Sequence, residues 1–204
     1  DITISRPSDA DLTISLSLLK AFPKEKAGGK QIMKSKYEAL LEPYKPQMLK
    51  DLAGLVAINS VYDESTVDDE NPFGKGVSKA LEFVNQMAIR DGFKSRNIKN
   101  MVVEIVAGEG DKNITIMAHA DVVPEGTGWD QNPFELIEKD GVLSGRGVAD
   151  DKGPMLASYY ALKALRDNNL LGQYKVRFLV GGNEETGSRG IEYYFSQKEN
   201  EQPT

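Results

Sequence analysis

The sequence predicts a three-layer α/β/α fold built on a mixed β-sheet, with helices on both faces. Two observations support this class. Segments with helical periodicity alternate along the chain with short apolar runs of strand character, which is typical of α/β domains. Short turns that contain glycine also join some neighbouring strands, as they do in β-hairpins.

Composition limits the class of protein. The chain has 204 residues, 40% of them hydrophobic, which is enough for one domain or a small pair. Its net charge of -6 argues against binding to nucleic acid or to an anionic membrane. No apolar run approaches the roughly 20 residues that span a bilayer, and the N-terminus lacks a signal-peptide pattern, so we expect a cytoplasmic protein. Without cysteine, any metal must be held by oxygen and imidazole, which suits zinc, manganese or cobalt.

Residues 1–35 differ from the rest and are expected to form an N-terminal extension whose role the sequence leaves open. The apolar residues between Leu12 and Leu18 alternate with strand period, whereas Asp9 or Asp11 could instead cap a short helix. The extension could be a tag or a surface-docking arm.

Three helices are expected next, over residues 30–41, 46–57 and 74–91. Pro46 suits the first turn of the second helix, and Gly92 ends the third. Between them, the acidic stretch 63–72 could hold calcium in principle. Its spacing does not match an EF-hand, so a solvated loop is favoured.

The second half of the chain is expected to contain most of the strands. Strands at 101–107 and 113–118 form a hairpin whose loop contains Gly108 and Gly110, both able to adopt positive φ. A second hairpin joins 135–138 to 142–144 through Asp140-Gly141. A helix at about 150–167, a strand at 174–180 and a short helix at 190–195 follow.

A histidine and an aspartate follow the strand that ends near residue 118. His119 is the only histidine of the sequence, and Asp121 comes two residues later. The ends of strands line the ligand crevice of an open α/β sheet, so both side chains are placed for chemistry. A nearby carboxylate can orient a metal-binding imidazole and raise its basicity. The alternative is a histidine that is simply a satisfied polar residue.

Two further acidic pairs follow glycine-rich turns. Asp150 and Asp151 precede a helix, where carboxylates commonly serve as caps, and Glu184 and Glu185 could lie on a solvated surface. Neither alternative excludes metal binding. Three such clusters together indicate a carboxylate-rich site that holds two metal ions, with a carboxylate between the ions and a base near the water.

These residues lie in motifs that resemble a known family, the dizinc hydrolases that include glutamate carboxypeptidase, succinyl-diaminopimelate desuccinylase, carnosinase and aminoacylase. The likeness is strongest to bacterial dipeptidase V and its relatives, and it covers residues 36–204. The motifs are Met-Ala-His119-Ala-Asp121-Val-Val-Pro, Gly-Trp129-Asp-Gln-Asn-Pro-Phe134, Gly-Arg-Gly-Val-Ala-Asp150-Asp-Lys-Gly-Pro154 and Gly-Asn-Glu184-Glu185-Thr-Gly-Ser188.

The resemblance implies a role for each matching residue. His119 would bind one metal ion, with Asp121 as its orienting partner, and Glu185 would bind the second. Asp150 would bridge the two ions, and its peptide bond to the next residue would be cis. Glu184 would take a proton from the water and pass it to the leaving amine. The reaction implied is hydrolysis of the amide bond of dipeptides, with two zinc ions per complete site.

The chain also departs from this family. The resemblance implies two more ligands, an acidic residue soon after Glu185 and a late histidine, and neither has a match here. We therefore expect residues 36–204 to be the N-terminal portion of a metallopeptidase catalytic domain, without its lid domain and C-terminal part, and inactive alone. We expect a strand edge and apolar helix faces such as that of Val77 to be partly uncovered, which would favour self-association or instability. Alternatives are an N-acyl amino acid deacylase or desuccinylase of the same family, or a non-catalytic binding module.

Overall fold

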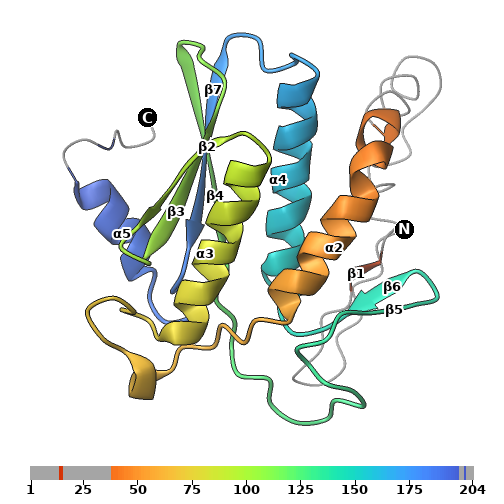
Figure 1. Cartoon of the computed structure of the whole chain (residues 1–204), viewed down its shortest axis with the longest axis vertical. Helices are drawn as coiled ribbons and strands as arrows, with labels where there is room; N and C mark the ends of the chain where they lie inside the picture. The colour runs from red at the N-terminus through yellow and green to blue at the C-terminus, as the bar shows by residue number, and fades with distance from the viewer. Residues whose placement is uncertain (1–13, 16–37, 198–199, 201–204) are drawn as a thin grey trace.

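A four-stranded mixed sheet forms the centre of the computed structural model, which describes residues 14–15, 38–197 and 200 (Figure 1). The strand order is β2-β3-β7-β4, in which β7 pairs antiparallel with β3 and parallel with β4. The predicted α/β class with a mixed sheet is confirmed. The strands are β2 (Lys94–Ile98), β3 (Val102–Ala107), β4 (Lys112–His119) and β7 (Tyr174–Gly181).

The predicted hairpin between residues 101–107 and 113–118 is wrong, because β7 lies between β3 and β4. The last four residues of β7 are buried, and a strand covered on both faces belongs inside a sheet rather than at its edge. The loop after β3 therefore crosses the start of β7. A Cβ on Gly108 would lie 2.3 Å from the carbonyl oxygen of Tyr174, and one on Gly110 would lie 2.0 Å from that of Gln173. Both positions need glycine for this close approach.

Strand β2 was not predicted. It forms one edge of the sheet and pairs antiparallel with β3 from Lys94↔Val106 to Ile98↔Val102. Residues 99–101 join the two strands, and the first two, Lys99 and Asn100, have φ values of 54° and 51°. The strand lacks a fully buried residue and has mostly polar side chains, so it carries no apolar run that would reveal it.

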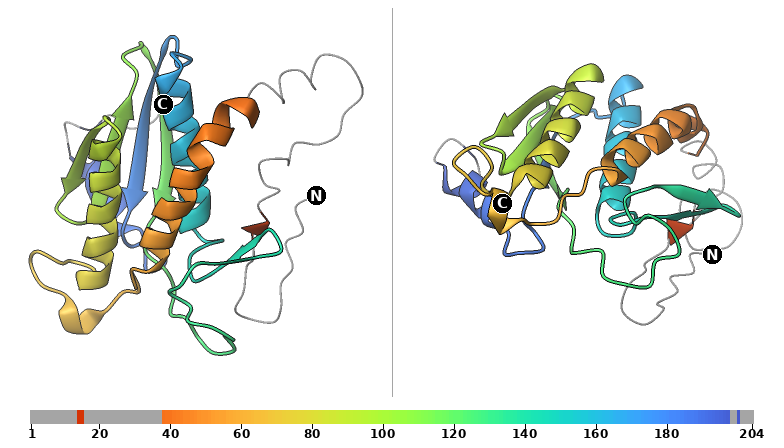
Figure 2. Two further views of the ribbon diagram at one scale, coloured as in Figure 1. Left: turned by 45° about the vertical axis from the view of Figure 1, so that its right-hand side comes forward. Right: turned by 60° about the horizontal axis from the view of Figure 1, so that its bottom comes forward.

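Three long helices cover one face of the sheet, and one short helix covers the other (Figures 1 and 2). Helices α3 and α4 contact the sheet directly, whereas α2 packs against α3 and α4. The predicted helices are confirmed to within about two residues. Of the helix predicted at 30–41, residues 38–41 are helical and the rest lies outside the described residues. The helices are α2 (Lys45–Val56), α3 (Lys75–Arg90), α4 (Lys152–Asp167) and α5 (Arg189–Ser196).

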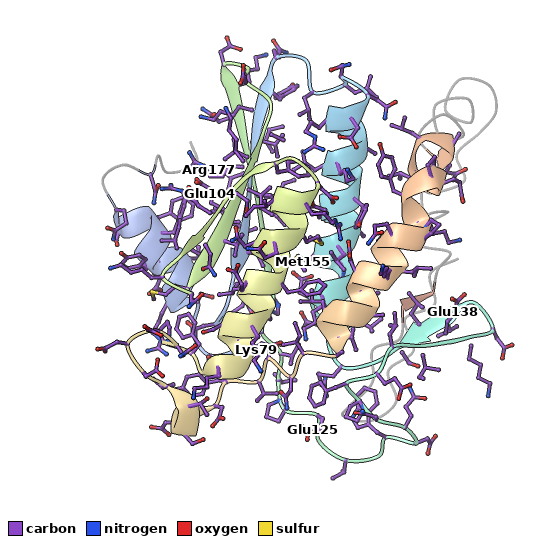
Figure 3. All side chains as sticks on the ribbon, viewed as in Figure 1. Lys79, Glu104, Glu125, Glu138, Met155 and Arg177 are labelled. Atoms are coloured by element: carbon purple, nitrogen blue, oxygen red, sulfur yellow. The ribbon has the colours of Figure 1, made fainter. Side chains whose placement is uncertain are left out.

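A buried carboxylate anchors α5 to its face of the sheet. Glu104 on β3 accepts hydrogen bonds from the hydroxyl of Tyr194 on α5 and from Nε of Arg96, the latter at 2.5 Å. Arg177 on β7 lies 3.6 Å away and beside Glu104 in Figure 3. Each polar group of this cluster has a partner of opposite charge or polarity, which is the condition for burying a carboxylate at acceptable cost.

The predicted uncovering of helix faces is wrong, since Val77 on α3 is completely buried in the main core. Exposed apolar side chains lie on β4, which forms an edge of the sheet within the described residues, in agreement with the predicted strand edge. Ile114 is 40% exposed and Met117 is 58% exposed. Self-association stays a prediction, and of the two predicted surfaces the strand edge at β4 is the one that the structure leaves exposed.

A small hairpin stands beside the main sheet, as predicted. Strands β5 (Ile137–Lys139) and β6 (Val142–Ser144) pair through Asp140-Gly141, whose φ values are 53° and 76°. Strand β1 (Ile14–Ser15) pairs with β6. The remainder of the predicted extension lies outside the described residues, so its boundary and role stay predictions. Within the described part of the chain, no helix has the length and apolar character needed to cross a membrane.

Truncation of a core residue on α3 should separate buried from exposed positions of the same helix. Leu81 is fully buried and Ile89 is 49% exposed. We expect Leu81→Ala to lower the free energy of unfolding by about 2–5 kcal/mol. Ile89→Ala should change it by about 0.5 kcal/mol or less. Urea unfolding followed by circular dichroism measures both, and similar losses for the two variants would contradict this packing of α3.

Candidate metal centre

The carboxyl ends of β4 and β7 bring two of the predicted clusters together. These strands are parallel and end in register, with His119 opposite Gly181. Residues that follow the two strands therefore emerge at the same edge of the sheet. Helix α4 begins at this edge, so Asp150 and Asp151 arrive there as well (Figure 1).

Three side chains at this edge form a group that could hold a metal ion. One ligand atom each from His119, Asp150 and Glu185 lies within 4.8 Å of the other two, the only such group of three or more found among the described residues. Nε2 of His119 is 3.1 Å from Oδ1 of Asp150. The side chain of His119 is 10% exposed and that of Asp150 is 72% exposed, so the group is anchored inside and opens to solvent.

The ring of His119 is held by Asp121. Its Nδ1 lies 3.1 Å from the backbone oxygen of Asp121 and 3.4 Å from Oδ1 of that residue. Both neighbours are acceptors, and so is Oδ1 of Asp150 beside Nε2, so the metal-free ring, whose pKa is raised to about 9, carries a proton on each nitrogen. If a metal ion replaces the proton on Nε2, Nδ1 keeps the proton that faces Asp121. That is the tautomer a metal ligand needs on this side.

Asp121 has a second set of contacts that the sequence did not predict. Its Oδ1 accepts a hydrogen bond from the backbone N–H of Glu184 at 3.0 Å, and its Oδ2 accepts one from that of Glu185 at 3.1 Å. The side chain is 2% exposed. This carboxylate therefore fixes the histidine ring and the acidic pair relative to one another.

Asp151 does not act as the helix cap that its position before α4 favoured. It occupies the N-cap position, but its side chain makes no capping hydrogen bond. Its Oδ2 accepts from the backbone N–H of His119 at 3.1 Å instead. The Asp150–Asp151 peptide bond is cis, as the family resemblance implied. The two adjacent carboxylates thus contact the ring and the backbone of one histidine.

The acidic pair after β7 faces the same space. Oε2 of Glu184 lies 3.8 Å from Nε2 of His119, and its side chain is 56% exposed. The turn is stabilised by Asn183, which is 1% exposed and whose Oδ1 accepts from the backbone N–H of Arg189 at 2.7 Å. Sequence analysis missed the role of Asn183, since an asparagine after two glycines reads as an ordinary turn residue.

Crowded carboxylates shift the pKa values at this edge. Burial alone would lower the pKa of His119, but the hydrogen bond and charge of Asp121 and the charge of Asp151 raise it to about 9. Burial and then the charge of Asp150 raise the pKa of Glu185. Like charges at close range disfavour ionisation. A cation would relieve this repulsion, and imidazole with carboxylates is a donor set that fits zinc, manganese or cobalt.

Comparisons with known proteins agree with this chemistry. Residues 115–203 match the family described as "Peptidase family M20/M25/M40". The chain is 39% identical over 159 residues to a Staphylococcus aureus (strain USA300) protein named "Putative dipeptidase SAUSA300_1697". That match covers 78% of this chain and 34% of the relative, so the chain spans about a third of the length of the curated relatives it matches.

Two solved structures share the fold. Human carnosine dipeptidase 1 is 25% identical, with a TM-score of 0.64 over 78% of this chain and 36% of its own. The M20 family metallo-carboxypeptidase Sso-CP2 from Sulfolobus solfataricus is 25% identical, with a TM-score of 0.59 over 72% of this chain and 33% of its own. The expected family resemblance and fold are thereby confirmed.

The raised pKa of His119 can be measured without ambiguity, because the chain has one histidine. In the metal-free chain, we expect its imidazole NMR signals to titrate with a pKa of about 9. Asp121→Asn removes the charge and should lower this pKa. Asp140→Asn, in the β5–β6 turn, is the matched control and should leave it unchanged. Equal effects of the two substitutions would contradict the arrangement of Asp121 and His119.

Proposed function

We propose that this chain, whose residues 115–203 match peptidase family M20/M25/M40, contributes the metal centre of a hydrolase that cleaves the amide bond of dipeptides. The observation that carries the proposal is the convergence of His119, Asp150 and Glu185 within 4.8 Å at the ends of two parallel strands. Relatives named as dipeptidases support the substrate class.

The donor set suits two divalent ions, which we propose to be zinc, with manganese or cobalt as alternatives. His119 would bind one ion and Glu185 the other, and the exposed carboxylate of Asp150 would be shared. Bound ions would supply Lewis acidity and would lower the pKa of a water molecule. Asp121 would keep the donors aligned through its hydrogen bonds to Glu184 and Glu185 and its contact with His119.

Glu184 is the residue that we propose as the general base. Its carboxylate is exposed and lies beside the ligand group, 3.8 Å from Nε2 of His119. From there it would accept a proton from the attacking water and deliver it to the nitrogen of the leaving amine. Asp121 is fully occupied by its own contacts, so its contribution to the reaction is one of positioning.

We also propose that the 204-residue chain alone has little or no peptidase activity. The ligand group brings together one imidazole and two carboxylates. A catalytic zinc site usually has three protein ligands per ion, so two ions would share fewer than the number they need.

Zinc binding tests the site directly. In calorimetry, His119→Ala and Glu185→Gln should each weaken binding at least about tenfold, whereas Glu138→Gln on the β5–β6 hairpin should not. Zinc must displace the proton of His119, so the apparent affinity should rise about tenfold per pH unit between pH 6 and 8. An unchanged zinc affinity in His119→Ala would contradict the proposed metal centre.

Hydrolysis assays test the reaction. With zinc, we expect the 204-residue chain to cleave dipeptides no faster than its His119→Ala variant. Where these residues stand within a protein of the relatives' length, dipeptides should be cleaved faster than N-acyl amino acids. Glu184→Gln should then lower kcat about 10²–10⁴-fold while zinc stays bound. Faster cleavage of N-acyl amino acids would favour the deacylase alternative, and a zinc-dependent rate from the chain alone would refute its proposed inactivity.

A further inference from the structure

Lys152 is the only lysine among the described residues that is completely buried. Its amino group donates hydrogen bonds to the backbone oxygens of Leu55 at 3.0 Å and Ile58 at 2.8 Å. Burial lowers the pKa of this group to about 7. Both the ammonium and the neutral amine carry enough N–H groups for two such bonds, so the contacts do not depend on the charge.

The carbonyl of Leu55 lies in the last turn of α2, where it also accepts from the backbone N–H of Ile58 at 3.2 Å, and Ile58 itself lies two residues beyond the helix. The final carbonyl groups of a helix lack partners within the helix, and donors from elsewhere satisfy them. Lys152 supplies such a donor from α4, 97 residues further along the chain from Leu55. Figure 1 shows the lower end of α2, where that helix ends, beside the lower end of α4, which begins at Lys152.

Lys152 also follows the acidic pair directly and is the first residue of α4. The pair makes two contacts with one histidine, from Asp150 to Nε2 and from Asp151 to the backbone N–H. Any movement of the start of α4 relative to α2 would shift both carboxylates. The amino group of Lys152 restrains that movement through its hydrogen bonds to the backbone oxygens of Leu55 and Ile58.

The aliphatic stem of Lys152 packs against the segments that carry the other site residues. A Cβ at Gly147 would lie 2.9 Å from Cδ of Lys152 and 2.9 Å from Cγ1 of Val122. Val122 directly follows Asp121, and its backbone N–H donates to Ser60 at 3.2 Å, just beyond α2. The stem is therefore enclosed by the strand that presents Asp121 and the turn that leads to Asp150.

We propose that Lys152 is a positioning residue of the metal centre, which holds the Asp150–Asp151 turn against the end of α2 and thereby keeps Asp150 beside His119. This inference rests on the proposed function only in that the group binds a metal ion. The placement of Asp150 against His119 can be tested without metal.

Lys152→Met is the informative variant, because it keeps an unbranched stem and removes the donor. Lys163→Met is the matched control. Lys163 lies on α4, three turns from Lys152, with its amino group 3.1 Å from Asp167, and it is 16% exposed. Each variant removes the amino-group contacts of one lysine of α4, but the control leaves the Asp150–Asp151 turn in place.

Three measurements are made on both variants and on the wild-type chain: the metal-free imidazole NMR spectrum of His119, zinc affinity by calorimetry, and urea unfolding. We expect Lys152→Met to shift the imidazole nitrogen signals and to weaken zinc binding at least about tenfold. Lys163→Met should leave both as in the wild type. Lys152→Arg, which keeps a donor, should recover part of the wild-type spectrum.

The outcomes separate this inference from the proposed function. Wild-type imidazole signals and zinc affinity in Lys152→Met would overturn the inference, as would equal changes in Lys163→Met. Failure of the wild-type chain to bind zinc would refute the metal centre, while the metal-free spectrum would still decide the role of Lys152. If Lys152→Met does not fold, the inference is tested on the wild-type chain by following the NMR signal of the side-chain nitrogen of Lys152. It should shift when zinc is added while that of Lys163 does not, and no shift would overturn the inference.

Discussion

The parallel register of β4 and β7 is the constraint on which the candidate site depends. Because His119 lies opposite Gly181, the chain leaves both strands at the same level, and the next few residues of each must share one small volume. Asp121 then converts this proximity into a fixed arrangement by accepting hydrogen bonds from the two glutamate amides. A shift of two residues in this register would carry the glutamates about 7 Å away from the histidine.

The same arrangement is electrostatically costly without a cation. His119 is surrounded by carboxylates from three segments, and the resulting rise of its pKa shows how strongly a positive charge is favoured there. The buried carboxylate of Glu104 is a useful contrast within the same sheet. It lies between Arg96 and Arg177, so its charge is compensated by the protein itself. Within the part of the chain that the structure describes, the acidic group at the end of β4 forms ion pairs with His119 and with no arginine, which distinguishes it from the compensated carboxylate of Glu104.

Sequence reasoning predicted the elements better than their pairing. Apolar periodicity marked α3 and α4 correctly, because each buries one face against the sheet. It could not show that β7 enters between β3 and β4, since that choice depends on burial of both faces of β7. The ligands could be predicted because they follow the ends of apolar strands, and such ends are recognisable in sequence. The partners of Asp121 and Lys152 were missed, because backbone N–H and C=O groups of distant residues leave no trace in side-chain identity.

These missed contacts show how the site and the fold are connected. The ligand group takes its residues from the end of β4, the start of α4 and the turn after β7, and the donor of Lys152 adds the end of α2. A ligand that binds this group in the folded chain and not in the unfolded chain would raise the free energy of unfolding. Well above Kd, this increase grows with the logarithm of the ratio of ligand concentration to Kd. That stabilisation would act on the contacts between these four elements rather than on any one element. The elements keep their own core through residues such as Leu81 and Val77, so metal binding would be coupled to folding through the contacts between elements rather than through the core.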